Sequence, residues 1–238
     1  SASPYQMRGI AKYLNDLGFT CYCIRLPGHG ETPRHLEKVS WKEILGVADK
    51  KLAEFKEKVD KVYLLGACVG GNIALKLAEK HKVHGVISVA TPIFLRYAKI
   101  IKYLSPIVKY IKPFIKKRRD SYEAEYLIRH GLIYDVFPIR CVPNVLKLMS
   151  ISKKALPYIT APILVMQSTN DYIINPKSAL YIYQESGSLI KKISIYDNKH
   201  HIILYYNNDD DVYKPIYDFI YENELKDYEK LKVNLDLT

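Results

Sequence analysis

The chain has 238 residues, of which 48% are hydrophobic, and its formal net charge is +11. This length and apolar fraction predict one sizeable globular domain with room for an insertion. The basic balance alone does not choose between nucleic acid, a membrane surface and an acidic substrate. No stretch of roughly 18 apolar residues is free of charge and no leader-like segment opens the chain, so neither a transmembrane helix nor a signal peptide is expected.

The four cysteines show no pattern typical of a metal site. Cys21 and Cys23 are separated by one residue, and the sequence has no second His or Cys pair at the spacing of metal ligands. Cys68 and Cys141 are isolated. We interpret all four as reduced thiols of a cytoplasmic protein.

Apolar runs and helical patterns alternate along the chain, which predicts an α/β fold with a mostly parallel sheet and helices on both faces. Ser3 and Pro4 predict the start of the first helix and Gly18 its end, and Ser40 with Glu43 forms a capping box. The expected helices span 4–17, 40–58, 70–81, 176–186 and 209–228. The expected strands span 19–24, 61–66, 83–89, 161–168 and 190–196.

Residues 92–157 interrupt this rhythm and predict a helical cap inserted into a core of residues 1–91 and 158–238. The segment holds no convincing strand and several prolines. Between residues 96 and 119 it carries nine cations and no acid: Arg96, Lys99, Lys102, Lys109, Lys112, Lys116, Lys117, Arg118 and Arg119. The run is typical of a solvated cap face, or of peripheral contact with an anionic membrane. No recognition motif supports nucleic-acid binding.

The stretch "YLLGACVGGN" (63–72) predicts a strand, a glycine-rich turn and a helix, with Cys68 at the turn. Its form is G-x-C-x-G, a nucleophile elbow with cysteine in place of serine. Gly66 and Gly70 are expected to leave room for the neighbouring strand and helix. A helix N-terminus beside the sulfur favours the thiolate. The alternative is a buried cysteine in an ordinary glycine turn.

A thiol nucleophile needs a base, and the base needs an orienting carboxylate. Asp171 follows the strand expected at 161–168, and His201 follows the last strand. The carboxyl ends of parallel strands meet at one edge of a sheet. The order nucleophile, acid and histidine therefore predicts a triad of Cys68, Asp171 and His201.

These residues resemble the α/β-hydrolase superfamily, and within it the small capped carboxylesterases and monoacylglycerol lipases. The resemblance spans nearly the whole chain and rests on "LPGHGETP" (26–33), "GACVGG" (66–71), "ATP" (90–92), "STNDYIINPKSA" (168–179) and "HHII" (200–203). It implies Asp171 as the acid, His201 as the base and the backbone N–H of Val69 as one oxyanion donor. It implies no chemical role for His29. His200 stands where glycine is more usual, which leaves a swap of roles between His200 and His201 open.

Two departures from that family affect the interpretation. Serine is usual at the elbow, and a cysteine there resembles dienelactone hydrolase; a natural thiol enzyme, a weakened esterase and an engineered acyl trap all stay open. The family's second oxyanion donor follows a strand that precedes the first helix, whereas here the first helix is expected from residue 4. We therefore expect an N-terminal strand and oxyanion loop to be absent from this sequence.

Together these features predict a carboxylic ester hydrolase that forms an acyl-enzyme on Cys68. The expected substrate is a small ester with a medium-length acyl chain or a monoacylglycerol, and apolar cap residues are candidates for an acyl pocket: Ile93, Phe94, Leu95, Ile100, Ile101, Leu104 and Ile107. No cofactor or metal is implied, and the oligomeric state is not predicted. The rival from another class is a non-catalytic binding protein on the same fold, with Cys68 as a relic.

Overall fold

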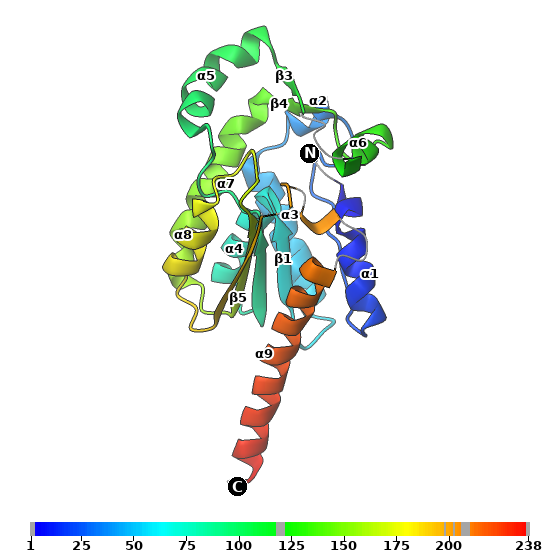
Figure 1. The fold of residues 1–238 in the computed structure, drawn as a ribbon, viewed down its shortest axis with the longest axis vertical. Coiled ribbons are helices and arrows are strands. Elements are labelled where there is room, and N and C mark those ends of the chain that lie inside the picture. Colours follow the sequence, from blue (N-terminus) through cyan, green and yellow to red (C-terminus); the bar gives the residue numbers. More distant parts are fainter. Residues whose placement is uncertain (1–2, 118–121, 198, 202, 206–209, 237–238) are drawn as a thin grey trace.

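Four parallel strands form the centre of the molecule in the order β1 (Tyr63–Ala67), β2 (Gly85–Val89), β5 (Ile163–Ser168) and β6 (Lys191–Tyr196) (Figure 1). The structure, a computed structural model, describes residues 3–117, 122–197, 199–201, 203–205 and 210–236. Side chains of β2 and β5 are buried throughout, whereas most of β1 and all of β6 are only partly buried or exposed. The two central strands therefore carry the core, and the predicted parallel sheet is confirmed.

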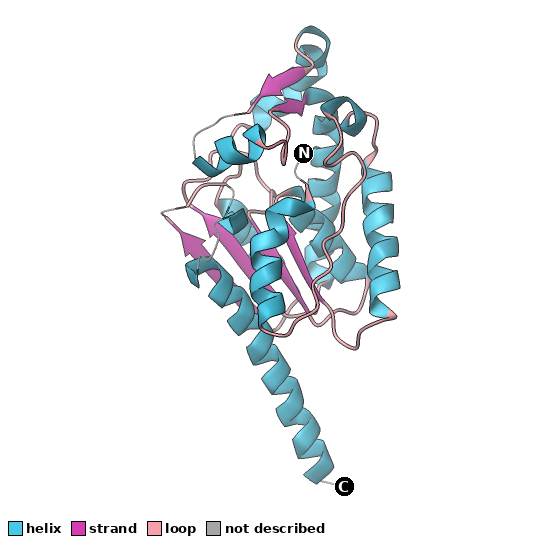
Figure 2. Ribbon diagram, turned by 90° about the vertical axis from the view of Figure 1, so that its right-hand side faces the viewer, coloured by secondary structure: helices cyan, strands magenta, loops and turns pink. Residues whose placement is uncertain are grey.

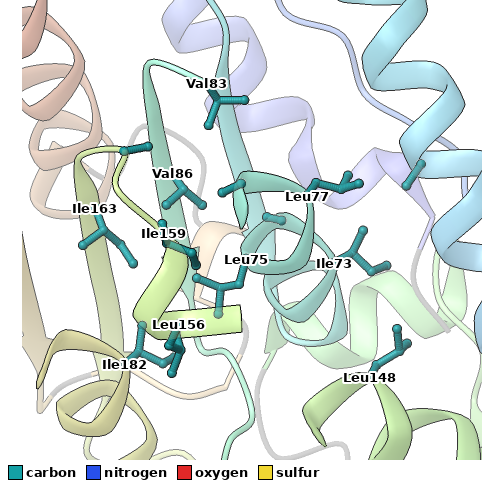
Figure 3. Close-up of a cluster of buried hydrophobic side chains, with 14 of the residues drawn as sticks. Ile73, Leu75, Leu77, Val83, Val86, Leu148, Leu156, Ile159, Ile163 and Ile182 are labelled. Carbon is teal, nitrogen blue, oxygen red and sulfur yellow. The ribbon is translucent and has the colours of Figure 1, made fainter. Parts of the chain in front are cut away.

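Alternate side chains of the central strands enter two separate hydrophobic cores, as the period of two in a strand requires. Val86 and Ile163 belong to one core, and their neighbours Ile87 and Leu164 belong to the other. Figure 3 shows the first core, where Leu75 is fully buried among side chains of the sheet and its helices.

Helices cover both faces of the sheet (Figure 2). The first core receives side chains from α3 (Trp41–Lys56), α4 (Val69–Lys80), α7 (Val142–Ala155) and α8 (Lys177–Glu185). The second receives them from α1 (Arg8–Asp16) and α9 (Asp210–Asp236). The short helical turns are η1 (Pro4–Met7), α2 (Pro33–Leu36), η2 (Ile139–Cys141), η3 (Leu156–Tyr158) and η4 (Ile203–Tyr205).

The segment between β2 and β5 contains α5 (Ala98–Ile111), β3 (Phe114–Lys116), α6 (Tyr122–Arg129) and β4 (Val136–Pro138), followed by η2 and α7. β3 and β4 pair as a small antiparallel sheet, so the expectation of no strand here was wrong. These strands have only three residues each, too few for a recognisable alternation. Figure 2 shows α5 and this small sheet beyond the arrowheads of the large sheet, where its carboxyl ends lie.

The strand expected at 19–24 is absent from the structure, and this prediction was wrong. Residues 20–23 are exposed, and no described strand pairs with them. Aromatic and β-branched residues gave "FTCYCI" its strand-like composition, but a strand is stable only when its backbone groups find a partner.

The predicted helices are confirmed, with differences at the start of the first helix and the end of the last. The first begins as the 3-10 turn η1, and Ser3 makes no capping hydrogen bond through its side chain. Ser40 and Glu43 form the full capping box at α3. The last helix continues to Asp236. Within the described ranges, no helix combines the length and apolar character needed to span a bilayer.

Candidate active site

Cys68 occupies a strained turn between β1 and α4. Its φ of 53° and ψ of −124° lie in a region that non-glycine residues rarely adopt. The Cys68 N–H donates to the carbonyl of Val89 at 2.9 Å, and the Cys68 carbonyl accepts from Gly71 N–H at 2.9 Å. These hydrogen bonds to β2 and within the first turn of α4 hold the residue at the carboxyl end of the sheet.

Two glycines permit this turn, but they are not both the expected ones. A Cβ on Gly66 would lie 2.2 Å from the carbonyl oxygen of Gly70, so the tight approach predicted there is confirmed. A Cβ on Gly70 would meet nothing within 4 Å, so that prediction was wrong. The second tight position is Gly71, whose Cβ would lie 1.8 Å from Oγ1 of Thr91. The motif marks the turn correctly, yet the packing constraint falls one residue later.

Asp171 lies in the loop after β5 with its carboxylate fully buried and fully hydrogen-bonded. Oδ1 accepts from the backbone N–H groups of Ile173 and Ile174, each at 2.9 Å. Oδ2 accepts from Nε2 of Gln167 at 3.1 Å and from Nδ1 of His201 at 2.7 Å. Burial alone would raise the pKa of Asp171, but the hydrogen bond and charge of His201 and the two backbone donors lower it. The acid is therefore held ionised against the histidine.

His201 connects Asp171 to the sulfur of Cys68. Burial would raise the pKa of Cys68, but the charge and hydrogen bond of His201, with the Val69 N–H, outweigh it and lower that pKa. Burial would likewise lower the pKa of His201, but the Cys68 thiolate and Asp171 raise it to about 10. Each charge stabilises the other, so these contacts favour a thiolate beside an imidazolium.

The two adjacent histidines differ in their surroundings. His200 is exposed, whereas His201 holds the hydrogen bond to Asp171. This contact favours His201 as the candidate base. Val69, at the first position of α4, directs its N–H at the Cys68 sulfur, which places that donor beside the candidate reacting atom. His29 bonds the Pro27 carbonyl through Nδ1 at 3.0 Å, and burial lowers its pKa to about 4.

Sequence reasoning missed two residues that support the acid. Gln167, the penultimate residue of β5, donates to the Asp171 carboxylate. Arg96 donates from Nη2 to the carbonyl of Thr169 at 2.8 Å and from Nε to the carbonyl of Asp171. Arg96 appeared only as one cation of a basic run, and nothing in that run separates it from its neighbours. Its role depends on a contact between segments 75 residues apart.

Part of the expected acyl pocket is wrong. Ile100, Leu104 and Ile107 are 57%, 50% and 61% exposed, so their side chains face solvent. Ile93 is buried in the first core. Arg118 and Arg119 of the basic run lie outside the described residues. No group of three His, Cys, Asp or Glu residues in the described part of the chain is arranged to hold a metal ion.

Known proteins match this chain over most of its length. A carboxylesterase of Bacillus subtilis (strain 168) is 22% identical over 218 residues, covering 90% of this chain and 86% of the relative. A thermostable monoacylglycerol lipase of Bacillus sp. (strain H-257) is 23% identical over 211 residues, covering 85% and 79%.

Two solved structures share the fold. One, from a study of the metagenome-derived lipolytic enzymes LipS and LipT, has a TM-score of 0.82 at 19% identity and covers 93% of this chain and 89% of its own. The monoacylglycerol lipase of Paleococcus ferrophilus has a TM-score of 0.77 at 20% identity, with 93% and 91% covered. The family model described as "Serine aminopeptidase, S33" matches residues 3–209. The chain therefore belongs to this hydrolase family, and its fold is that of the α/β-hydrolases.

Proposed function

We propose that this protein hydrolyses carboxylic esters through an acyl-enzyme on Cys68, with His201 as general base and acid and Asp171 as the orienting acid. The observation that carries the proposal is the buried series of contacts from Asp171 through His201 to a sulfur on a strained turn. Names of the two bacterial relatives support ester hydrolysis as the reaction class. A small ester with a medium-length acyl chain or a monoacylglycerol is the proposed substrate.

The reaction begins with attack of the Cys68 thiolate on the ester carbonyl. A carbon–sulfur bond forms, and the carbonyl electron pair moves to oxygen, near the Val69 N–H. The tetrahedral intermediate expels the alkoxide, which takes a proton from the His201 imidazolium. A thioester and neutral histidine remain. Water then attacks the thioester as His201 accepts its proton, and the carboxylic acid leaves with return of the thiolate.

The proposed cap consists of residues 92–157 over a core of residues 1–91 and 158–238. Leu95 forms an isolated antiparallel β-bridge with Ile174, which lies in the loop that holds Asp171 (the acid loop). In addition, the Asn175 N–H donates to the Phe94 carbonyl at 2.9 Å. The start of the segment is thus fixed to the loop that holds Asp171. Within it, α5 and the β3–β4 sheet lie beyond the carboxyl edge of the large sheet (Figure 2), the edge at which Cys68 lies.

A pre-steady-state trace with a short p-nitrophenyl ester tests the nucleophile. We expect a burst of nitrophenolate near one equivalent of enzyme, followed by a slower phase set by thioester hydrolysis. Cys68→Ala removes the thiol and should remove the burst. A burst retained by Cys68→Ala would contradict the proposal. Absence of any burst or turnover in the native chain would favour the rival, a non-catalytic binding protein on the hydrolase fold.

We also propose that α5 contacts the surface of an anionic membrane. Its apolar residues at helical spacing are exposed rather than packed: Ile100 57%, Leu104 50%, Ile107 61% and Ile111 80%. Arg96 and Lys112 are exposed at its two ends. An apolar stripe flanked by cations suits the interface of a bilayer that carries negative headgroups.

Sedimentation with vesicles tests this contact. Binding to vesicles rich in phosphatidylserine should exceed binding to pure phosphatidylcholine and should weaken as salt is raised. The double variant Ile107→Ser/Ile111→Ser should reduce binding about tenfold, because two side chains no longer enter the interface. Leu189, 99% exposed in the turn before β6, gives the control Leu189→Ser, which should bind normally. Equal binding by both variants would contradict the assignment to α5.

The proposed compartment is the cytoplasm. All four cysteines are free, and Cys21 and Cys23 are exposed, a state that suits a reducing environment.

A further inference from the structure

Ser178 binds the first residues of the proposed cap to α8. This serine, the second residue of α8, is fully buried. Its Oγ donates to the carbonyl of Phe94 at 3.1 Å and accepts from the N–H groups of Phe94 at 2.9 Å and Ile93 at 3.3 Å. A hydroxyl has one donor and two acceptor sites, so every site of this side chain is used on the backbone of one short segment.

The residues that follow in this segment pair with the acid loop. Residues 94–96 run antiparallel to residues 173–175, and the β-bridge described above joins the middle of the two segments. Next to that bridge, the Arg96 N–H donates to the carbonyl of Ile173 at 3.0 Å. The start of the cap and the acid loop therefore form a short backbone ladder, and Ser178 fixes one end of it.

One peptide group of this ladder also holds the carboxylate of Asp171. The carbonyl of Ile173 and the N–H of Ile174 belong to the same planar peptide unit. Its carbonyl accepts from the Arg96 N–H, and its N–H donates to Oδ1 of Asp171 at 2.9 Å. Because the unit is rigid, the position of the Arg96 N–H sets the direction of the Ile174 N–H. The other carboxylate oxygen, Oδ2, accepts from Nδ1 of His201 at 2.7 Å.

We propose that Ser178 is a positioning residue for Asp171. Its hydroxyl fixes residues 93 and 94, and the ladder carries this register to the N–H group that holds the carboxylate. The inference rests on the proposed ester hydrolysis and adds to its site a residue that acts through backbone groups. Loss of the hydroxyl should therefore change the orientation of His201 by Asp171 more than the binding of substrate.

A second serine provides a matched control at the opposite edge of the sheet. Oγ of Ser188 donates to the carbonyl of Ile190 at 2.9 Å and accepts from the N–H of the same residue at 3.2 Å. Ser188 is 2% exposed, and Ile190 directly precedes β6, at the amino end of that strand. Ser188→Ala thus removes hydrogen bonds of the same kind from a buried site outside the acid loop.

Packing should keep the Ser178→Ala variant folded. The ring of Phe94 lies edge-on to that of Tyr181 in α8, with the ring centroids 5.2 Å apart, and Nζ of Lys153 lies 4.5 Å from the centroid of Tyr181. The hydrogen bond from Asn175 to the Phe94 carbonyl also remains. The segment should therefore stay against α8 and lose only its exact register.

The Nδ1–H proton of His201 reports on its contact with Asp171 without any need for turnover. In a charge-assisted hydrogen bond this proton should give a far-downfield NMR signal that exchanges slowly with water, and His201→Asn identifies the signal by its loss. In Ser178→Ala the signal should broaden and exchange about tenfold faster, because the carboxylate is held less firmly. In Ser188→Ala it should stay as in the native chain.

Steady-state hydrolysis of p-nitrophenyl hexanoate gives the second measurement. In Ser178→Ala, kcat should fall about tenfold with little change in KM. Ser178→Cys keeps a weak donor and acceptor at the same place and should lose less. Ser188→Ala should keep the native kcat, although both alanine variants should lower Tm, because each loses buried hydrogen bonds.

A native signal and a native kcat in Ser178→Ala would overturn the inference. Equal changes of signal and kcat in Ser178→Ala and Ser188→Ala would also overturn it, because they would show a general loss of stability. A native chain that shows the His201 signal but hydrolyses no ester would instead contradict the proposed function. The signal still tests Ser178 in that case, so the two failures are distinguishable.

Discussion

Two aspartate–histidine pairs of nearly equal length lie at opposite ends of α4. At its N-terminal end, beside Cys68, Asp171 and His201 are 2.7 Å apart; at its C-terminal end, Asp49 and His81 are 2.6 Å apart. The Asp49 and His81 side chains are 28% and 18% exposed, and Asp49 also binds Lys80 at 2.6 Å. The Asp171 side chain is fully buried. An Asp–His contact alone therefore does not identify a catalytic site.

Burial and a third group make the difference between the pairs. The pKa of Asp49 is lowered chiefly by hydrogen bonds from His81 and Lys80, which is the behaviour of a surface ion pair. At Asp171 burial raises the pKa of the carboxyl group, and the hydrogen bonds must outweigh this effect to lower it. The histidine of this pair, His201, also interacts with the thiol of Cys68. The buried pair can thus act on the Cys68 sulfur, whereas the Asp49–His81 pair lies at the other end of α4.

The largest expected effect comes from neutralising one acid of each pair. Asp171→Asn leaves His201 without its charged partner and should lower kcat on the order of ten-thousandfold, as the loss of the aspartate does in Ser–His–Asp triads. Asp49→Asn breaks a pair of nearly the same length at the other end of α4 and should leave kcat within about twofold, because neither Asp49 nor His81 contacts the Cys68 sulfur. Steady-state hydrolysis of a p-nitrophenyl ester measures both. Equal losses in the two variants would remove the distinction between the pairs.

The next effect is on the reactivity of the thiol. The lowered pKa of Cys68 and the raised pKa of His201, about 10, predict that the thiolate persists to lower pH than in a free thiol. Alkylation of Cys68 by iodoacetamide should therefore continue below about pH 8.5, the ordinary pKa of a thiol, and should there be faster than alkylation of a free thiol.

The same experiment contains its own controls. Burial raises the pKa of Cys141 to about 11, so alkylation of Cys141 should require a higher pH than that of Cys68. In His201→Asn the imidazolium is lost, and the inflection of Cys68 should move upward because burial then dominates. Peptide mapping by mass spectrometry assigns each rate. An unchanged inflection in His201→Asn would show that the histidine does not activate the sulfur.

The smallest effect concerns the cations that hold each pair. Arg96→Ala frees the carbonyls of Thr169 and Asp171, so the acid loop should become less ordered and kcat should fall about tenfold with little change in KM. Arg96→Lys should recover part of the loss. Lys80→Met removes the cation of the surface pair and should leave kcat unchanged. Circular dichroism measures the fraction of Arg96→Ala that is folded. If kcat falls only by the fraction of protein that has unfolded, Arg96 has a purely structural role.

The sequence allowed prediction of those parts of the site that depend on local pattern. A strand followed by G-x-C-x-G predicted the elbow, and positions after two later strands predicted Asp171 and His201, because parallel strands place their carboxyl ends together. The contribution of Arg96 could not be predicted. Arg96 was one cation of a basic run, and only the fold shows that it binds the loop that holds Asp171.

The failures in the fold have a similar origin. Residues 19–24 have the composition of a strand, but a strand also depends on a neighbour that composition does not supply. Ile100, Leu104 and Ile107 were expected to face an acyl pocket, but they are exposed, because the apolar character of a residue does not show whether it points inward or outward.

The most direct test of the central claim is the mass of the enzyme during turnover. The native chain is mixed with p-nitrophenyl hexanoate, quenched in acid within the burst and digested with pepsin for mass spectrometry. We predict one hexanoyl group on the peptide that contains Cys68, released by neutral hydroxylamine as expected for a thioester, and absent from Cys68→Ala. Turnover without acylation of Cys68, or an acyl group on another residue, would contradict the account.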